Sequence, residues 1–132
     1  MKKQICILLA LLCATVCSIG VFADSILVPI LDNTADGNVQ IIFSDTDGTA
    51  IAKIQTNSNS AKITGKLAVY REVGSGWIFV DHVYDTSANG VLALHLDFTG
   101  TSGTAYKAEL TATATLNGDS EPISKTAYKT CP

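Results

Sequence analysis

The sequence predicts an all-β protein, an antiparallel β-sandwich of seven to eight short strands. After the first 23 residues, apolar and polar residues alternate with a period of two, as in strands that bury one face. Turn residues separate these runs at short, regular intervals, which is typical of a Greek-key sandwich. No helical repeat lies between the runs, and its absence argues against a parallel sheet. An up-and-down barrel is the alternative architecture.

The clearest strand covers residues 104–116, where one face is small and apolar and the other carries threonine and charged residues. Alternating threonines favour a strand over an alanine-rich helix. Residues 91–98 repeat the pattern, with leucines directed inward and His95 and Asp97 outward. The expected strands are 26–31, 38–44, 49–56, 61–72, 77–84, 91–98, 104–116 and 121–129.

Glycine-containing turns account for the breaks between the runs. A glycine after Asp or Asn supplies the positive φ that tight turns require. Gly74-Ser75-Gly76 separates two further strands. The Asx-Gly pairs are Asp36-Gly37, Asp47-Gly48, Asn89-Gly90 and Asn117-Gly118.

The first 23 residues are typical of a secretory signal peptide. Lys2 and Lys3 precede an apolar stretch, and Val21-Phe22-Ala23 places small residues at the −3 and −1 positions of a cleavage site. An uncleaved membrane anchor is the alternative, but no basic stop-transfer flank follows. We expect a secreted, extracellular protein with no membrane span in its mature chain. Its parts are a cleaved signal helix at 1–23, an N-terminal segment at 24–37 and a β-sandwich domain at 38–132.

Cleavage changes both the charge and the cysteine content. Removing 23 of 132 residues leaves 109, and removing two of the 9 basic residues leaves 7 against 12 acidic ones, a net charge of −5. Without a basic cluster, nucleic acid and anionic membranes are not expected partners. Only Cys131 remains, so no intramolecular disulfide can form. We expect its thiol to be exposed, either inert or joined to a second chain in a disulfide dimer.

Composition and motifs exclude several classes of protein. Hydrophobic residues make up 47% of the chain and charged residues 16%, which argues against disorder and against a coiled coil. The sequence contains no Gly-x-Ser-x-Gly, no His-Glu-x-x-His, and no Walker or dinucleotide glycine motif. We therefore expect no enzyme activity, no catalytic residue and no cofactor.

Two groups of residues raise the question of a metal site. Asp45-Thr46-Asp47-Gly48 resembles the start of a calcium loop, which Asp32 and Asp36 could supplement; the simpler interpretation is a hairpin turn. His82 and His95 would bind a transition metal only if adjacent strands brought them together. We assign no metal ligand, and whether Asp45 and Asp47 bind a cation stays open.

The aromatic residues divide into expected core and expected surface positions. Trp77 and Tyr106 are expected in the core. Alternatively, Tyr106 forms a tyrosine corner, in which the hydroxyl group hydrogen-bonds to the backbone between two strands. Tyr70 alternates onto a polar face, where Tyr84 could join it. An exposed pair of this kind could stack on a sugar.

One stretch resembles a known class of module. The run Lys66-Leu67-Ala68-Val69-Tyr70-Arg71, a glycine turn, Trp77 and then Asp85 to Gly90 resembles bacterial immunoglobulin-like modules. The segments 103–112 and 117–122 are similar to the F–G hairpin of fibronectin type III domains. The resemblance covers roughly residues 38–129 and extends to small exported proteins of Gram-positive bacteria. It implies an immunoglobulin-like sandwich, and a shared fold does not by itself assign a function.

Two functions follow as hypotheses. The first is a secreted, non-catalytic protein that binds an extracellular protein partner through a sheet edge or loops. The alternative is a glycan- or calcium-binding module that uses Tyr70 and Tyr84, or Asp45 and Asp47. A contiguous solvent-facing aromatic patch would favour a glycan ligand, whereas a long open edge at 121–129 would favour a protein.

Overall fold

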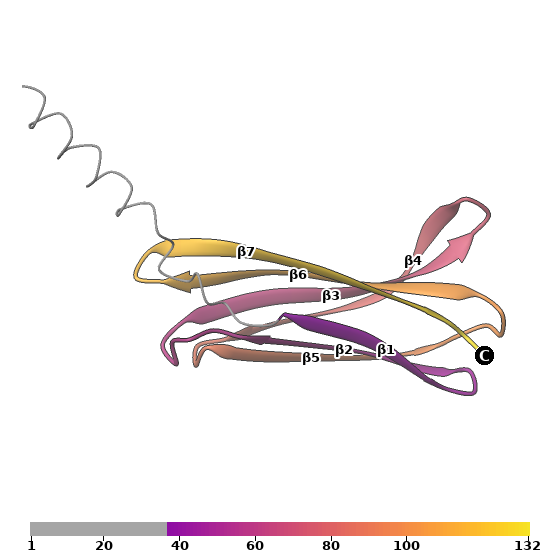
Figure 1. Cartoon of the computed structure of the whole chain (residues 1–132), viewed down its shortest axis with the longest axis horizontal. Coiled ribbons are helices and arrows are strands. Elements are labelled where there is room, and N and C mark those ends of the chain that lie inside the picture. The colour runs from indigo at the N-terminus through magenta and orange to yellow at the C-terminus, as the bar shows by residue number, and fades with distance from the viewer. Residues whose placement is uncertain (1–36) are drawn as a thin grey trace, which may run out of the picture. The chain divides into compact units, whose positions relative to one another are not determined.

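The computed structural model describes residues 37–132, which form an antiparallel β-sandwich of two sheets (Figure 1). One sheet has the order β1-β2-β5 and the other β4-β3-β6-β7. No helix long and apolar enough to cross a membrane occurs in this part of the chain. The strands are β1 (Asn38–Ser44), β2 (Asp47–Gln55), β3 (Lys62–Val73), β4 (Gly76–Ser87), β5 (Val91–Thr99), β6 (Ala105–Leu116) and β7 (Asp119–Thr130).

These strands confirm the all-β prediction and seven of the eight expected runs. The expected strand 26–31 and the signal helix at 1–23 lie outside the described residues. Three pairs of consecutive strands form hairpins within one sheet: β1 with β2, β3 with β4, and β6 with β7. The other connections cross between the sheets, as in a Greek key. Relative to a constant-type immunoglobulin sandwich, β4 pairs with β3 instead of extending the first sheet.

The turn predictions are confirmed at some glycines and wrong at another. Asn117 and Gly118 have φ of 52° and 84°, as a two-residue type I′ hairpin requires. Gly90 also has a positive φ, of 78°. Gly48 was expected in a turn, but it lies buried within β2, and the residue with positive φ in that hairpin is Asp45. A Cβ on Gly48 would come within 2.8 Å of two phenylalanine rings, so here glycine provides space.

The core fills the space between the sheets with alternating large and small side chains. Leu92 and Leu94 of β5 pack over Gly65 of β3, so that a Cβ on Gly65 would lie 2.8 Å from Leu92 and 3.3 Å from Leu94. Such interdigitation gives a protein interior its high packing density. The buried apolar residues include Ala50, Ala52, Ile54, Ile63, Leu67, Val69, Leu92, Leu94, Leu96, Ala108, Leu110, Ala112 and Ala114.

One end of the sandwich is closed by three aromatic rings. Phe43, Phe98 and Tyr106 pack with ring centroids 5.3 to 5.6 Å apart. Tyr106 is 1% exposed, and its hydroxyl accepts a hydrogen bond of 2.8 Å from the backbone N–H of Thr101. This confirms the expectation that Tyr106 is a core residue and forms a tyrosine corner between β5 and β6.

The expectation of an exposed thiol is wrong. Cys131 is 1% exposed beside the aromatic rings, and its Sγ lies 3.6 Å from the carbonyl oxygen of Asp45. Its backbone N–H donates to Thr104, and its carbonyl accepts from Gly103. A disulfide dimer through this thiol would require the C-terminal segment to leave these hydrogen bonds. Dimer formation therefore stays a prediction, and one that the burial of the thiol disfavours.

Candidate functional site: the outer face of the four-stranded sheet

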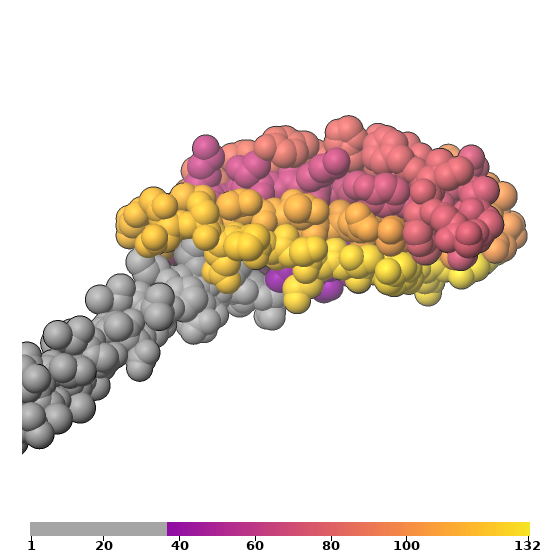
Figure 2. Space-filling view, turned by 90° about the horizontal axis from the view of Figure 1, so that it is seen from above, coloured from indigo at the N-terminus to yellow at the C-terminus, as the bar shows by residue number. Residues whose placement is uncertain are grey.

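The outer face of the four-stranded sheet carries five aromatic residues. Figure 2 looks onto this side of the molecule, with β7 in yellow along one border of the sheet and the hairpin of β3 and β4 at one end. The residues opposite one another along the strands place these side chains on the face that points away from the first sheet. They are Tyr70 on β3, Trp77, Phe79 and Tyr84 on β4, and Tyr128 on β7.

Four of these rings form a contiguous cluster, here called the aromatic corner: Tyr70, Trp77, Phe79 and Tyr128. The ring centroids of Tyr70 and Phe79 lie 5.9 Å apart, and those of Trp77 and Tyr128 lie 5.8 Å apart. Phe79 is 51% exposed and Tyr128 66%. The aromatic corner therefore exposes aromatic side chains to solvent, and its rings already contact one another in two pairs.

A β-bulge shapes this corner. The pairing of β3 with β4 shifts between Val69 and Tyr70, which leaves Val80 without a partner on β3. A bulge bends its strand and increases the local twist. Beyond this point the hairpin of β3 and β4 turns up from the plane of the sheet (Figure 1), and Trp77 from that hairpin contacts Tyr128 of the far strand.

Lys107 joins the two halves of the aromatic corner. Its Nζ lies 4.9 Å from the ring centroids of both Tyr70 and Trp77, within the range of a cation–π interaction. The same atom lies 2.9 Å from a carboxylate oxygen of Glu109. This hydrogen bond raises the pKa of Lys107, so the ammonium group stays charged between the rings. The corner thus combines apolar rings with a fixed donor and acceptor.

The structure corrects the placement of Trp77 and agrees with that of two tyrosines. Trp77 was expected in the core, but it is half-buried on the outer face, because the hairpin that carries it extends beyond the bulge. Tyr70 and Tyr84 both lie on the outer face, as expected. Tyr128 was missed, although it alternates with hydroxyl residues along β7 and its face could have been read from that pattern.

His82 and His95 cannot share a metal ion. His82 lies on the outer face of the four-stranded sheet, opposite Ala68 and against the ring of Phe79. His95 lies opposite Ile51 on the outer face of the other sheet. The strands are consecutive along the chain, but the connection crosses between sheets, so the two imidazoles point away from each other. The condition that the sequence set for a shared metal site, adjacent strands that bring the two histidines together, is therefore not met.

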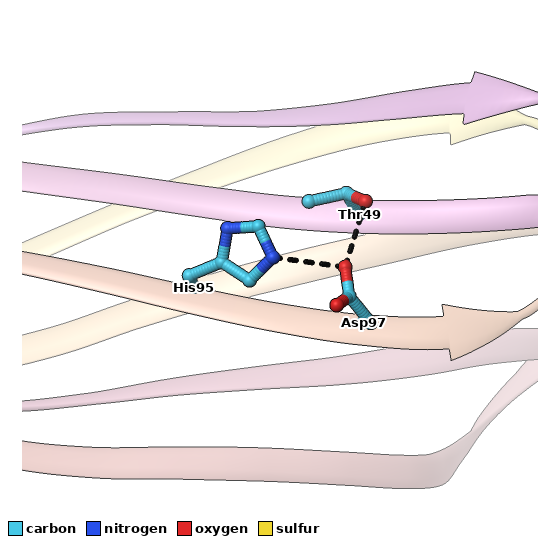
Figure 3. Close-up of polar contacts among 3 residues, drawn as sticks. All are labelled: Thr49, His95 and Asp97. Atoms are coloured by element: carbon cyan, nitrogen blue, oxygen red, sulfur yellow. Dashed lines mark hydrogen bonds and ion pairs between the residues drawn. The ribbon is translucent and has the colours of Figure 1, made fainter.

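His95 takes part in a polar cluster on the three-stranded sheet (Figure 3). Its Nε2 lies 2.9 Å from Oδ1 of Asp97, and the hydroxyl of Thr49 donates to the same oxygen at 2.9 Å. The carboxylate sits between the hydroxyl and the imidazole. In a nucleophilic triad the imidazole occupies the central place, so this arrangement does not activate the Thr49 hydroxyl.

Replacing Thr49 by valine should raise the pKa of Asp97. The hydrogen bond from Thr49 is the main cause that lowers this pKa from its ordinary value of 3.8, and His95 adds to it. Valine keeps the shape of the side chain and the preference for a strand but removes the donor. A carboxyl-carbon NMR titration measures the change, and Thr111→Val on the opposite sheet is the control.

The sign of the pH effect follows from the lowered pKa. The stability that Asp97 contributes is present above its unfolded-state pKa and is lost as the pH falls through the folded-state value. Thr49→Val should reduce this contribution and leave neutral-pH folding intact. An unchanged pKa for Asp97 in the variant would show that Thr49 is not the cause.

The Asp45 and Asp47 pair occupies a hairpin. Asp45 lies in the two-residue loop and Asp47 opens β2, paired with Ser44 on one side and Thr99 on the other. Within residues 37–132, no group of three or more His, Cys, Asp or Glu side chains is close enough to hold a metal ion. Asp32 and Asp36, the other proposed ligands, lie outside these residues. Cation binding at Asp45 and Asp47 stays a hypothesis.

Comparisons with known proteins add little to this geometry. No protein-family model and no curated protein matches the chain. Among solved structures, a protein from Archaeoglobus fulgidus is similar at 11% sequence identity, with a TM-score of 0.36. That alignment covers 73% of this chain and 95% of that one.

Proposed function

We propose that the protein is an exported, non-catalytic glycan-binding module of the immunoglobulin-like class, which binds through the outer face of its four-stranded sheet. The observation that carries this proposal is the aromatic corner. A pyranose ring presents an apolar C–H face and a rim of hydroxyls. The exposed rings of Phe79 and Tyr128 suit the C–H face, and the paired Lys107 and Glu109 suit the hydroxyls.

The exposed rings of the aromatic corner are better suited to binding a ligand than to stabilising the fold. Exposed aromatic side chains that gather in one patch contribute little to the core and usually mark a binding surface. The rings of Tyr70, Trp77 and Phe79 already contact neighbouring side chains, so binding would order few additional side chains. A pre-arranged surface of this type suits a flexible, hydroxyl-rich ligand.

Different observations support the immunoglobulin-like fold class and the export of the protein. The three-on-four division of strands and the tyrosine corner at Tyr106 favour an immunoglobulin-like module. The signal-like residues Lys2, Lys3 and Val21-Phe22-Ala23 favour secretion.

A protein partner is the second candidate function, favoured by the edge of the four-stranded sheet. β7 is a long strand and pairs within the described residues only with β6. Strand addition to such an edge is a common mode of recognition. Pro122 and the lysines Lys125 and Lys129 discourage pairing at this edge, however. The aromatic corner therefore gives the stronger argument.

Thermal melts with a panel of cell-wall and mucin-type glycans test the proposal. A ligand that binds only the folded state stabilises it by about 2.7 kcal/mol at a hundredfold excess over its Kd. We expect a glycan to raise the midpoint, and the double variant Phe79→Ala/Tyr128→Ala to weaken that binding at least about tenfold, because truncated aromatic anchors commonly cost more than 1 kcal/mol.

The matched control is Ile42→Ala. Ile42 is 49% exposed, much like Phe79, but lies on the outer face of the other sheet. Its loss should leave glycan binding unchanged. The proposal fails if no glycan moves the midpoint, or if the double variant binds as the unaltered protein does. In that case, a protein partner that binds at the edge strand β7 becomes the leading alternative.

A further inference from the structure

A shallow depression lies on the same outer face, beyond the aromatic corner. Its volume is about 350 Å³, and it opens over the pair formed by Gly65 of β3 and Ala112 of β6. These two residues direct no bulky side chain outward. Four side chains stand at its corners in two cross-strand pairs, and the ring of Tyr84 borders it from β4; the corner residues are Thr64, Lys66, Thr111 and Thr113.

The dimensions of the depression suit a single sugar ring. Corner residues two apart along a strand are separated by about 6.8 Å, and neighbouring strands by about 4.8 Å. Tyr84 is 63% exposed and lies directly opposite Lys66, which places its ring beside the depression. Directly opposed residues of an antiparallel pair interact through their side chains.

Three polar groups of the depression have no side-chain partner among the described residues, whereas the hydroxyl of Thr64 lies 3.3 Å from that of Thr86. Lys66 makes no ion pair or hydrogen bond through its side chain among residues 37–132. Lys107, the cation of the aromatic corner, is by contrast paired with Glu109. The hydroxyls of Thr111 and Thr113 likewise have no hydrogen-bond partner in the described part of the chain. The depression therefore holds one uncompensated positive charge and two free hydroxyls beside an exposed ring.

We infer that this depression is a subsite for a carboxylate-bearing sugar. Its carboxylate would pair with the ammonium of Lys66, its C–H face would stack on Tyr84, and its hydroxyls would bond to Thr111 and Thr113. The inference rests on the proposed glycan-binding function and specifies the class of ligand. An acidic ligand is favoured over a neutral one because Lys66 carries a positive charge and forms no ion pair among residues 37–132.

Calorimetric titrations with matched probes test the inference. The acidic probes are 3′-sialyllactose and trigalacturonate, and the neutral probes are lactose and maltotriose. We expect the acidic probes to bind at least tenfold more tightly than their neutral counterparts at low salt. Lys66→Gln should remove that preference, Lys66→Arg should retain it, and Tyr84→Ala should weaken binding of both acidic probes.

The control variant is Lys53→Gln, which removes an exposed lysine from the opposite sheet and should change nothing. Equal affinity for acidic and neutral probes, or an undiminished preference in Lys66→Gln, overturns the inference. Neutral probes that bind through Phe79 and Tyr128 without any preference for acid would leave the proposed function standing and refute the subsite alone. If no probe of either kind binds, the subsite is refuted, whereas the proposed function fails only if no glycan of the wider panel raises the melting midpoint.

Discussion

Replacing Tyr106 by alanine should lower the free energy of unfolding by roughly 3–5 kcal/mol, the usual cost of deleting a fully buried aromatic side chain. The ring packs against Phe43 and Phe98 at the end of the sandwich, and its hydroxyl anchors Thr101. Its loss would leave a cavity between the two sheets and an unpaired backbone N–H. Urea denaturation followed by the fluorescence of Trp77 measures the change.

Tyr106→Phe separates the two contributions. Phenylalanine keeps the ring contacts and removes only the acceptor for the Thr101 N–H, so we expect a loss of about 1 kcal/mol. Tyr128→Ala is the matched control, because that tyrosine is largely exposed and its deletion should cost far less. Similar losses for Tyr106→Ala and Tyr128→Ala would contradict the placement of Tyr106 in the core.

The strands could be predicted from the sequence because each has one buried face. In β5 and β6, alternation places leucines and alanines inward and polar residues outward, and the structure buries the former. The tyrosine corner could also be anticipated, since Tyr106 opens the strand that follows a Gly/Ser/Thr loop. Local periodicity is sufficient where the two sheets cover a strand along its length.

The candidate site could be predicted only in part, since it depends on features that no local pattern encodes. Tyr70 and Tyr84 follow from alternation, but the bulge at Val80 shifts the register of β4 and changes which residues of the hairpin face outward. Trp77 was misplaced for this reason. The contact between Trp77 and Tyr128 joins strands on opposite borders of a sheet, and such a pairing requires the three-dimensional arrangement.

Tertiary structure also settles the question of the histidine pair and explains the error at Gly48. His82 and His95 lie on consecutive strands, and only the sheet order reveals that these strands belong to different sheets. Gly48 has the sequence of a turn, but the rings of Phe43 and Phe98 occupy the space where a side chain would lie. In both cases, neighbours distant in sequence decide the role of the residue.

Gly90→Ala should be as damaging as the loss of Tyr106. Gly90 has a φ of 78°, and a Cβ at this position would lie 2.0 Å from the carbonyl oxygen of Ser58. The surrounding loops cannot simply move apart, because the Gly90 N–H donates to Ala61 and its carbonyl accepts from the N–H of Thr56, both at 2.9 Å. The left-handed backbone costs an alanine about 1–2 kcal/mol. Breaking buried hydrogen bonds adds about 1–3 kcal/mol each.

Gly103→Ala measures the backbone part of this effect alone, so the difference between the two variants gives the steric part. Gly103 has a φ of 80°, almost the same as Gly90, but a Cβ there would meet no atom within 4 Å. We therefore expect Gly103→Ala to lose only the backbone cost of about 1–2 kcal/mol, and Gly90→Ala to lose roughly 3–5 kcal/mol in the same denaturation experiment. Equal losses would mean that the loop of Ser58 yields freely and that the hydrogen bonds around Gly90 do not hold this end of the sandwich closed.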